Sequence, residues 1–312
     1  MRCLVTGASG FLGACLVQKL LERQHEVTIL LRPNGCPVRL QGCLERVSIL
    51  YGSLEDLSEL EAELQQKPVD AVFHLAWSGV TGEFRNSTEP AIQNLIGSLR
   101  LWDLLRKNSC SVFIGVGSQA EYGPQAIALA ENLPTSPQTV YGASKLALGV
   151  LLKQLCSSTG MRFTWMRLLS AYGPGDDERH MVPSLINALL HGEKPALTAG
   201  EQIWDYLYVD DAATALCAVL ENKASGIFNL GSGQPCVLRD FVTLLRDSIN
   251  PALPLGFGET PYRPDQVMYL EADISRLTAA TGWKPTTSLA EGIRKTVEWY
   301  RNQGAIHAGK RG

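Results

Sequence analysis

The sequence predicts an α/β protein built on a doubly wound parallel sheet, with a smaller lobe in the C-terminal part of the chain. Two observations predict this fold. Short apolar runs alternate with amphipathic helical stretches through the first 170 residues, which is typical of a parallel sheet covered on both faces. In addition, a glycine-rich turn, Thr6 to Gly13, lies between the first apolar run and the first helical stretch. A turn in this position is typical of a dinucleotide-binding sheet, so the fold is expected to be Rossmann-like.

The expected elements follow one another in order along the chain. Strands are expected at residues 3–5, 27–31, 47–50, 69–75, 111–116, 162–166 and 227–230, and helices at 11–22, 55–66, 90–107 and 141–158. After residue 170, glycine and proline interrupt the pattern. These later segments are expected to cap the carboxyl ends of the strands, where open α/β sheets bind their ligands.

The same pattern divides the chain into two domains. We assign residues 1–169 with 203–231 to a dinucleotide-binding domain, and residues 170–202 with 232–300 to a smaller substrate-binding lobe. Residues 301–312 are expected to form a flexible tail, because chain ends are commonly disordered unless they are tied down.

The composition argues against several classes of function. The 312 residues are 45% hydrophobic and 19% charged, with a net charge of −3, so there is no electrostatic reason to expect a nucleic acid or a membrane as partner. The eight cysteines form no C-x-x-C pair and no cluster with histidine, which favours reduced thiols over disulfides or a metal site. No apolar run has the length of a membrane span, and the first strand begins too early for a signal peptide. We therefore expect a cytoplasmic protein.

The glycine-rich turn predicts a site for a pyrophosphate. Gly7, Gly10 and Gly13 follow a strand and open a helix, so main-chain N–H groups and the helix N-terminus can approach a negatively charged group. Their spacing is G-x-x-G-x-x-G rather than the commoner G-x-G-x-x-G. A glycine turn without any ligand is the alternative interpretation.

The end of the second strand indicates which dinucleotide is bound. In NAD-binding sheets an acidic residue there binds the ribose 2′-hydroxyl. Here the strand ends in Leu31 and Arg32, and Arg39 follows a little further on. Because a guanidinium pairs well with a phosphate, NADP is the expected cofactor. An arginine that is merely solvated in a loop is the alternative.

A tyrosine and a lysine four residues apart, Tyr141 and Lys145, are the candidate acid/base pair. On a helix these two residues share one face, and a nearby ammonium stabilises a phenolate. Alone, such a pair is common on helix surfaces. Ser118 stands at the end of the strand that precedes this helix, and two hydroxyl donors together would stabilise the charge that develops on a carbonyl oxygen receiving hydride.

Several of these motifs together resemble one family. They are Gly7, Gly10 and Gly13, then His74-Leu75-Ala76, Asn94, Ser118, Tyr141 with Lys145, and Arg263-Pro264-Asp265. The chain is similar, from residue 1 to about residue 300, to the extended short-chain dehydrogenase/reductases, in the branch that holds nucleotide-sugar 4-epimerases, 4,6-dehydratases and 4-ketoreductases. The segment Gly117 to Gly123 resembles most the sugar 4-reductases, such as the GDP-4-keto-6-deoxy-D-mannose reductases.

The resemblance implies a role for each matching residue. Tyr141 would be the acid/base, Lys145 would lower its pKa and hold the nicotinamide ribose, and Ser118 would hydrogen-bond the sugar oxygen. The implied cofactor contacts are Gly7, Ser9, Gly10, Phe11, Leu12, Gly13, Arg32, Ser53, Leu54, Leu75, Ala76 and Lys145. The implied substrate contacts are Trp77, Glu121, Ser170, His180, Val182, Trp204 and Arg263.

Departures from the family pattern narrow the expected reaction. Gln119 and Ala120 stand where the dehydratases carry an Asp-Glu pair, which argues against 4,6-dehydration. The epimerase-reductases that make GDP-fucose have a cysteine in place of Ala120 and a histidine matching His180, so double epimerisation is not expected. Trp204 replaces an arginine that binds the diphosphate, which leaves Arg263 as the main phosphate cation.

The expected function is therefore NADPH-dependent reduction of the 4-keto group of a nucleotide-activated 4-keto-6-deoxy sugar. The alternative is an NAD(P)-dependent nucleotide-sugar 4-epimerase, against which Arg32 argues. A non-catalytic, cofactor-binding regulator is a lesser alternative, because it would not need the set Ser118, Tyr141 and Lys145. The apolar stripes of the helices at 90–107 and 141–158 predict a homodimer, as in similar proteins. The nucleobase, the sugar and the product stereochemistry are left open.

Overall fold

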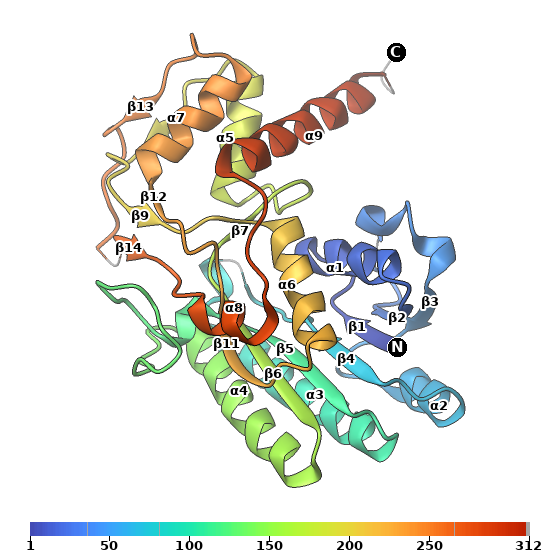
Figure 1. The fold of residues 1–312 in the computed structure, drawn as a ribbon. Coiled ribbons are helices and arrows are strands. Elements are labelled where there is room, and N and C mark those ends of the chain that lie inside the picture. The colour runs from blue at the N-terminus through green and yellow to red at the C-terminus, as the bar shows by residue number, and fades with distance from the viewer. Residues whose placement is uncertain (36, 81, 265, 310–312) are drawn as a thin grey trace.

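A seven-stranded parallel sheet forms the centre of the molecule in the computed structural model, which describes residues 1–35, 37–80, 82–264 and 266–309 (Figure 1). Its strand order is β3-β2-β1-β4-β5-β6-β11, and all neighbouring strands are parallel. The strands are β1 (Arg2–Thr6), β2 (Glu26–Leu31), β3 (Ser48–Tyr51), β4 (Ala71–His74), β5 (Val112–Ser118), β6 (Arg162–Leu168) and β11 (Gly226–Leu230). The predicted doubly wound α/β fold is confirmed.

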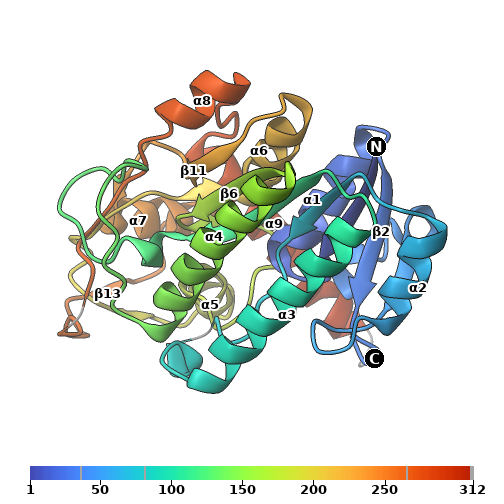
Figure 2. The same cartoon turned by 90° about the horizontal axis from the view of Figure 1, so that it is seen from below.

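Helices cover both faces of this sheet because each buries one apolar stripe against it. On one face, α1 (Phe11–Glu22) and α6 (Val209–Glu221) pack on each other and on the strands. On the other face lie α2 (Ser58–Gln66), α3 (Thr88–Lys107) and α4 (Val140–Thr159), with α3 and α4 side by side (Figure 2). The helix expected at 11–22 has these same bounds, whereas α2 begins three residues later than expected.

The remaining segments build a smaller lobe beside the carboxyl ends of the strands (Figure 1). Its core consists of three helices that pack together, α5 (Met181–Leu190), α7 (Leu238–Ile249) and α9 (Leu289–Gly309), around an aromatic cluster that contains Tyr172, Tyr208 and Phe241. Short strands complete the lobe: β7 (Ala171–Tyr172), β8 (Ala196–Leu197), β9 (Ile203–Trp204), β10 (Leu207–Tyr208), β12 (Cys236–Val237), β13 (Gly256–Phe257) and β14 (Tyr269–Leu270). The other short elements are α8 (Ser275–Thr281) and the 3-10 turns η1 (Val38–Leu40), η2 (Leu44–Arg46), η3 (Gly82–Phe84) and η4 (Gln119–Glu121).

The division between sheet domain and lobe differs from the expected one in two places. β9 pairs with β12 and β14, and β10 pairs with β7, so both belong to the lobe, although residues 203–231 were assigned to the sheet domain. Conversely, Leu277 and Trp283 pack into the core of the sheet domain, although the lobe was expected to include them. The first difference arises from strand pairing and the second from a shared apolar cluster, in both cases between segments that are distant in the sequence.

A flexible tail is expected from residue 301, but Arg301 is part of helix α9. Helix α9 continues to Gly309, and the Arg301 guanidinium donates to the carbonyl oxygens of Ser248 and Ile249 at the end of α7. Helix C-termini leave such carbonyls without an internal partner, so this contact ties the two helices together. Residues 310–312 lie outside the described part of the chain.

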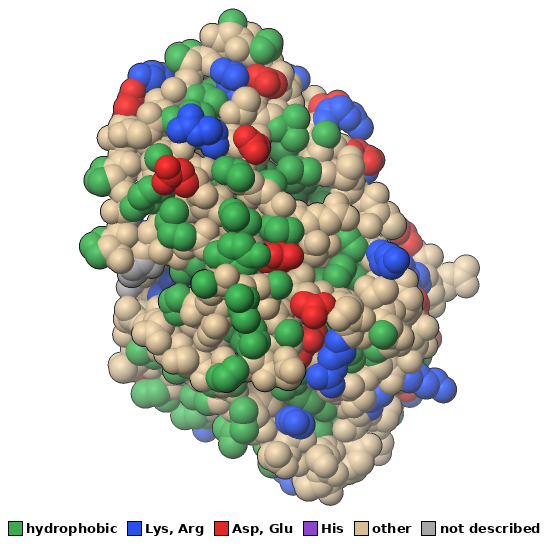
Figure 3. All heavy atoms as spheres, turned by 60° about the vertical axis from the view of Figure 1, so that its left-hand side comes forward, with side chains coloured by type: hydrophobic (Ala, Val, Ile, Leu, Met, Phe, Trp, Pro, Cys, Tyr) green, Lys and Arg blue, Asp and Glu red, His purple; other side chains and the backbone are tan. Residues whose placement is uncertain are grey.

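The surface carries hydrophobic side chains in several places. Figure 3 shows the face that comes forward from the left-hand side of Figure 1, where hydrophobic side chains lie among charged ones. Ile127 and Met268 are among the exposed large hydrophobic residues. Within the described ranges, no helix is both long and apolar enough to cross a bilayer. The described cysteines are free thiols, and Cys36 lies outside the described residues. The described side chains include no group of three or more His, Cys, Asp or Glu placed to hold a metal ion.

Candidate active site

The glycine-rich turn brings the main chain of β1, α1 and the β4 loop into close contact. Gly7 has a φ of +72°, and a Cβ atom there would lie 2.7 Å from the Ala76 nitrogen. A Cβ at Gly13 would lie 2.1 Å from the Gly7 oxygen. Helix α1 begins after Gly10 without a side-chain capping hydrogen bond, so its first N–H groups face the turn. This cradle fits the pyrophosphate of a dinucleotide.

A cleft of about 490 Å³ opens from this turn across the carboxyl ends of β1, β2 and β4. It brings together many of the predicted cofactor residues, namely Gly7, Ser9, Gly10, Arg32, Ser53, Leu54, Leu75 and Ala76. The predicted Phe11, Leu12, Gly13 and Lys145 do not line it. The Leu12 side chain is packed in the core, so only its main chain could contact a ligand.

Two arginines line the cleft: Arg32, which directly follows β2, and Arg39 on η1. Arg32 is exposed, and its side chain makes no hydrogen bond or ion pair with the described residues. The Arg39 guanidinium is already engaged, because it donates to the carbonyl oxygens of Gly175 and Ser9 at 2.6 and 3.3 Å. Glu55 also lines the cleft, so its wall is not exclusively cationic. Arg32 is the guanidinium that remains available to a ligand.

A buried hydrogen-bond network holds the loop that follows β4. Both ring nitrogens of His74 form hydrogen bonds, Nδ1 with the Thr6 hydroxyl and Nε2 with the Ser98 hydroxyl, at 2.8 Å each. Burial lowers the pKa of His74 to about 3, and the charge of Lys145 acts in the same direction, so the imidazole is neutral at ordinary pH. The Asn94 side-chain amide accepts a hydrogen bond from the Ser78 main-chain N–H and donates one to the Ser78 carbonyl oxygen, at 2.9 Å each.

Ser118 and Tyr141 meet at the end of β5. Ser118 is buried, and it caps η4 by accepting a hydrogen bond from the Ala120 N–H at 3.2 Å. Thr139 caps α4 by accepting from the Gly142 N–H at 3.0 Å, which places Tyr141 in the first turn of that helix. Burial raises the pKa of Tyr141, while a side-chain hydrogen bond with Ser118 and the charge of Arg85 oppose this rise.

Lys145 lies one turn further along α4 and is buried. Its ammonium donates to the Val116 oxygen at 2.7 Å and lies 3.9 Å from the centre of the Trp77 ring. Burial lowers the pKa of Lys145 to about 7, and the Glu121 carboxylate opposes that fall. The charges that act on Tyr141 are those of Arg85 and Glu121. The expectation that Lys145 lowers the pKa of Tyr141 stays a prediction.

Trp77 forms the wall between the cleft and Tyr141. Its ring meets the Tyr141 ring edge-on, with the centroids 6.3 Å apart. Trp77, Ser78 and Asn94 line both the cleft and a second cavity that also borders Tyr141. That second cavity has a volume of about 10 Å³, which is room for no more than one water molecule.

Glu121 was expected to contact substrate, and the structure corrects this. Its carboxylate is 1% exposed. One oxygen accepts from the Ser118 N–H at 2.9 Å and the Trp165 indole N–H at 3.0 Å, and the other accepts from Arg167 at 2.7 Å. A buried carboxylate requires hydrogen-bond partners of this kind. Through its bond with the Ser118 N–H, Glu121 therefore holds Ser118 in position.

The other predicted substrate residues lie in or near the lobe. The side chain of Val182, an expected substrate contact, is buried in the lobe core. Trp204 lies on β9 and packs on the apolar cluster around Tyr122. Ser170 follows β6 and is partly buried, and Arg263 is exposed. His180 precedes α5, is half exposed, and hydrogen-bonds Asp176 at 2.9 Å, which raises its pKa.

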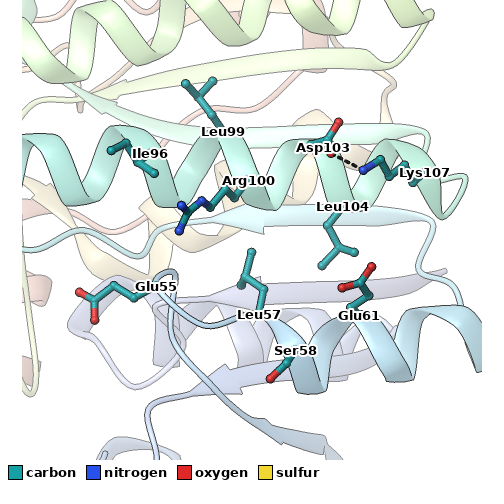
Figure 4. A pocket seen from close by; sticks show the side chains of 10 residues that line it. All are labelled: Glu55, Leu57, Ser58, Glu61, Ile96, Leu99, Arg100, Asp103, Leu104 and Lys107. Atoms are coloured by element: carbon teal, nitrogen blue, oxygen red, sulfur yellow. Dashed lines mark ion pairs between the residues drawn. The ribbon is translucent and has the colours of Figure 1, made fainter.

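Another hollow, a groove of about 570 Å³, lies between the start of α2 and the outer side of α3 (Figure 4). Leu57 and Leu104 point toward one another across it, and Asp103 pairs with Lys107 along its rim. Neither Ser118 nor Tyr141 lines this groove. The catalytic candidates are therefore not part of the groove, and Tyr141 instead borders the small cavity that shares Trp77, Ser78 and Asn94 with the cleft.

Sequence reasoning missed two residues beside the catalytic candidates. Arg85 lies over the Tyr141 ring, with its guanidinium carbon 5.2 Å from the ring centroid. Arg167 is 4% exposed and pairs with Glu121. A single arginine in a loop or a strand forms no recognisable sequence motif. The roles of Arg85 and Arg167 depend on contacts between segments that are distant in the chain.

The parallel sheet, the glycine-rich turn and the set Ser118, Tyr141 and Lys145 together define a short-chain dehydrogenase/reductase of the extended type. The sequence matches the NAD dependent epimerase/dehydratase family over residues 3–231. The chain belongs to that family.

Relatives in this family carry out different reactions. UDP-glucose 4-epimerase of Mycolicibacterium smegmatis is 29% identical over 314 residues, which cover 97% of this chain and 99% of that protein. The dTDP-4-dehydro-6-deoxyglucose reductase of Escherichia coli is 26% identical over 310 residues, with coverages of 96% and 97%. The fold is similar to that of UDP-glucose 4-epimerase from Thermus thermophilus in complex with NAD, with a TM-score of 0.85, 28% identity, and coverages of 96% and 99%. Family membership alone does not choose between epimerisation and reduction.

Proposed function

We propose that this protein reduces the 4-keto group of a nucleotide-activated 4-keto-6-deoxy sugar with NADPH. The observation that carries the proposal is the pairing of two features. Arg32, and no carboxylate, stands at the end of β2 with a side chain available to a 2′-phosphate, and Ser118 and Tyr141 form a pair of hydroxyl donors at the end of β5. The relationship to a dTDP-4-dehydro-6-deoxyglucose reductase supports it.

The proposed reaction needs one hydride and one proton. NADPH supplies the hydride to carbon 4 when it is bound. Tyr141 donates its phenolic proton to the carbonyl oxygen, which becomes the 4-hydroxyl, and the resulting phenolate is later protonated from solvent. Ser118 donates a hydrogen bond to the same oxygen and stabilises the negative charge that develops on it. Glu121 keeps Ser118 in position through its main-chain N–H at 2.9 Å.

A nucleotide-sugar 4-epimerase is the second candidate, because UDP-glucose 4-epimerases are among the relatives. An epimerase returns the hydride to the same substrate, so it consumes no reduced cofactor over a full cycle. Net oxidation of NADPH therefore separates the two candidates.

The deciding experiment offers the protein a panel of dTDP-, GDP-, CDP- and UDP-linked 4-keto-6-deoxy sugars with NADPH. We expect stoichiometric NADPH oxidation with at least one of them, and an alcohol at carbon 4 by NMR. Conversion of UDP-glucose to UDP-galactose without net NADPH oxidation would instead identify an epimerase. With dTDP-glucose or GDP-mannose we expect no 4-keto product, because Gln119 and Ala120 cannot exchange the protons that dehydration requires.

Arg32→Asp is expected to shift cofactor preference from NADPH toward NADH. A hydrogen bond to a charged group contributes about 1.5–3 kcal/mol, so the affinity for NADPH should fall at least about tenfold. The added carboxylate can in addition accept from the ribose 2′-hydroxyl of NADH. Calorimetric titration with both cofactors, with Arg32→Gln as the charge-neutral comparison, measures the change. Equal affinity of the unmodified protein for NADPH and NADH would contradict the assignment.

We also propose a homodimer formed by α3 and α4. Ile92 and Ile96 on α3 are 51% and 46% exposed, and Val150 and Leu151 on α4 are 52% and 44% exposed, on two helices that lie side by side (Figure 2). An apolar surface of this kind marks an interaction site. Light scattering at micromolar concentration should give the mass of a dimer, and Ile92→Glu with Val150→Glu should give a folded monomer. A monomeric unmodified protein would refute the proposal.

A further inference from the structure

The segment that precedes α3 is docked onto the first turn of α4. The Arg85 carbonyl oxygen accepts a hydrogen bond from the Tyr141 N–H at 2.8 Å. The next side chain, Asn86, accepts from the Val140 N–H at 3.2 Å. The first N–H groups of a helix have no partner within the helix. Residues 85 and 86 therefore supply partners to the turn that carries Tyr141.

The Arg85 side chain folds over the same tyrosine. Its guanidinium carbon lies 5.2 Å from the centre of the Tyr141 ring, within the range of a cation–π contact. Its Nε is buried and lacks a hydrogen-bond partner among the described residues. No carboxylate of the described residues forms an ion pair with it. The positive charge of Arg85 is thus directed at Tyr141 and is not neutralised by a described neighbour.

The other charged groups that face Tyr141 are already engaged. From η4, the Glu121 carboxylate pairs with Arg167 at 2.7 Å. From α4 itself, the Lys145 ammonium donates to the main chain of β5 at 2.7 Å. From β5, Ser118 is uncharged and contributes a hydrogen bond. Among the charged groups that face Tyr141, the Arg85 guanidinium is the one that forms no ion pair or hydrogen bond with another described residue.

We propose that Arg85 is a positioning residue for Tyr141, which holds the start of α4 through its carbonyl oxygen and stabilises the phenolate through its guanidinium. The kinetic part of this inference rests on the proposed reductase function. The electrostatic part does not, because it concerns the tyrosine of the free protein. When Tyr141 gives its proton to the carbonyl oxygen, a negative charge remains on the phenol, and a cation held nearby lowers the energy of that state.

The first test follows the ionisation of Tyr141 directly, without substrate. Protein labelled with carbon-13 at the tyrosine ζ position is titrated by NMR, and the resonance of Tyr141 is identified by its loss in Tyr141→Phe. Removing the positive charge in Arg85→Gln is expected to raise the pKa of Tyr141 by about one unit or more. Arg85→Lys should restore most of that difference. An unchanged pKa in Arg85→Gln would overturn the proposal.

A matched control is available on α3. The Arg106 guanidinium carbon lies 5.4 Å from the centre of the Trp102 ring, a stacking geometry like that of Arg85 but on a different aromatic ring. Arg106→Gln should leave the titration of Tyr141 unchanged. If Arg106→Gln moved the pKa as far as Arg85→Gln, the effect would be one of overall charge and the assignment of Arg85 would fall.

The second test separates positioning from substrate binding. With NADPH and dTDP-4-keto-6-deoxyglucose as the probe, Arg85→Gln is expected to lower kcat about tenfold with KM little changed, and Arg85→Lys should recover most of kcat. A raised KM with an unchanged kcat and an unchanged tyrosine titration would make Arg85 a substrate-binding cation and would overturn the inference. If the titration shifts as expected but no 4-keto sugar of the panel is reduced, the reductase proposal fails and the role of Arg85 toward Tyr141 stands.

Discussion

Tyr141→Phe is expected to lower kcat by about 10²–10⁴ while the affinity for NADPH changes little. Loss of one positioned acid commonly has an effect of this size on the chemical step. The substitution removes the phenolic oxygen and keeps the ring, which packs edge-on against Trp77 and beneath the Arg85 guanidinium. The main-chain bond from residue 141 to Arg85 is also kept. The effect should therefore fall on proton transfer and not on folding.

Steady-state kinetics with a reducible 4-keto sugar, together with calorimetric titration of NADPH, measure the two quantities separately. Tyr51→Phe is the matched control, because Tyr51 is 49% exposed at the end of β3 and should tolerate loss of its hydroxyl. If Tyr141→Phe kept more than half of the original kcat, Tyr141 would not be the acid. A parallel loss of NADPH affinity would indicate that the hydroxyl serves the cofactor instead.

The fold could be predicted because its signals are local. A β-run, a glycine turn and an amphipathic helix lie next to one another in residues 2–22, and each restricts the main chain without help from distant segments. The acid/base candidates could be predicted from the sequence for the same reason. Tyr141 and Lys145 are separated by one helical turn, and Ser118 stands where a strand ends.

What the sequence did not reveal depends on long-range contacts. Glu121 follows Ser118 by three residues in the chain, which suggested a place in the pocket, but its carboxylate is buried and pairs with Arg167 on β6. Lys145 is on the expected helix face, yet Trp77 and a β5 carbonyl hold its ammonium. Only the packing of separate elements decides such orientations, and no spacing along the chain encodes them.

The lobe boundary illustrates the same limit. Proline and glycine after residue 170, which end regular elements, suggested a lobe made of residues 170–202 and 232–300. The chain crosses between the two domains at other points than these. Helix α8 returns to the large sheet, where Leu277 is fully buried, and β9 leaves it for the lobe. Short apolar stretches without clear periodicity do not indicate which of two cores will receive them.

Glu121→Ala is expected to destabilise the protein by about 3–5 kcal/mol. Removal of one partner of a buried ion pair has an effect of this size, because the other charge is left without compensation. Here the charge left behind belongs to Arg167, which is 4% exposed and has one buried nitrogen, Nη1, without a described partner even in the intact pair. The Trp165 indole N–H would lose its acceptor as well.

Urea unfolding followed by circular dichroism measures this change, and two comparisons make it specific. Glu298→Ala breaks an exposed ion pair with Arg294, in which both side chains are more than half exposed, and should change stability by less than about 1 kcal/mol. The double variant Glu121→Ala with Arg167→Met removes both buried charges and should recover part of the loss, because the uncompensated guanidinium is then absent. If Glu121→Ala instead raised KM for the nucleotide sugar and left the urea midpoint unchanged, the carboxylate would face substrate, as the sequence first suggested, and the buried position assigned to it here would be wrong.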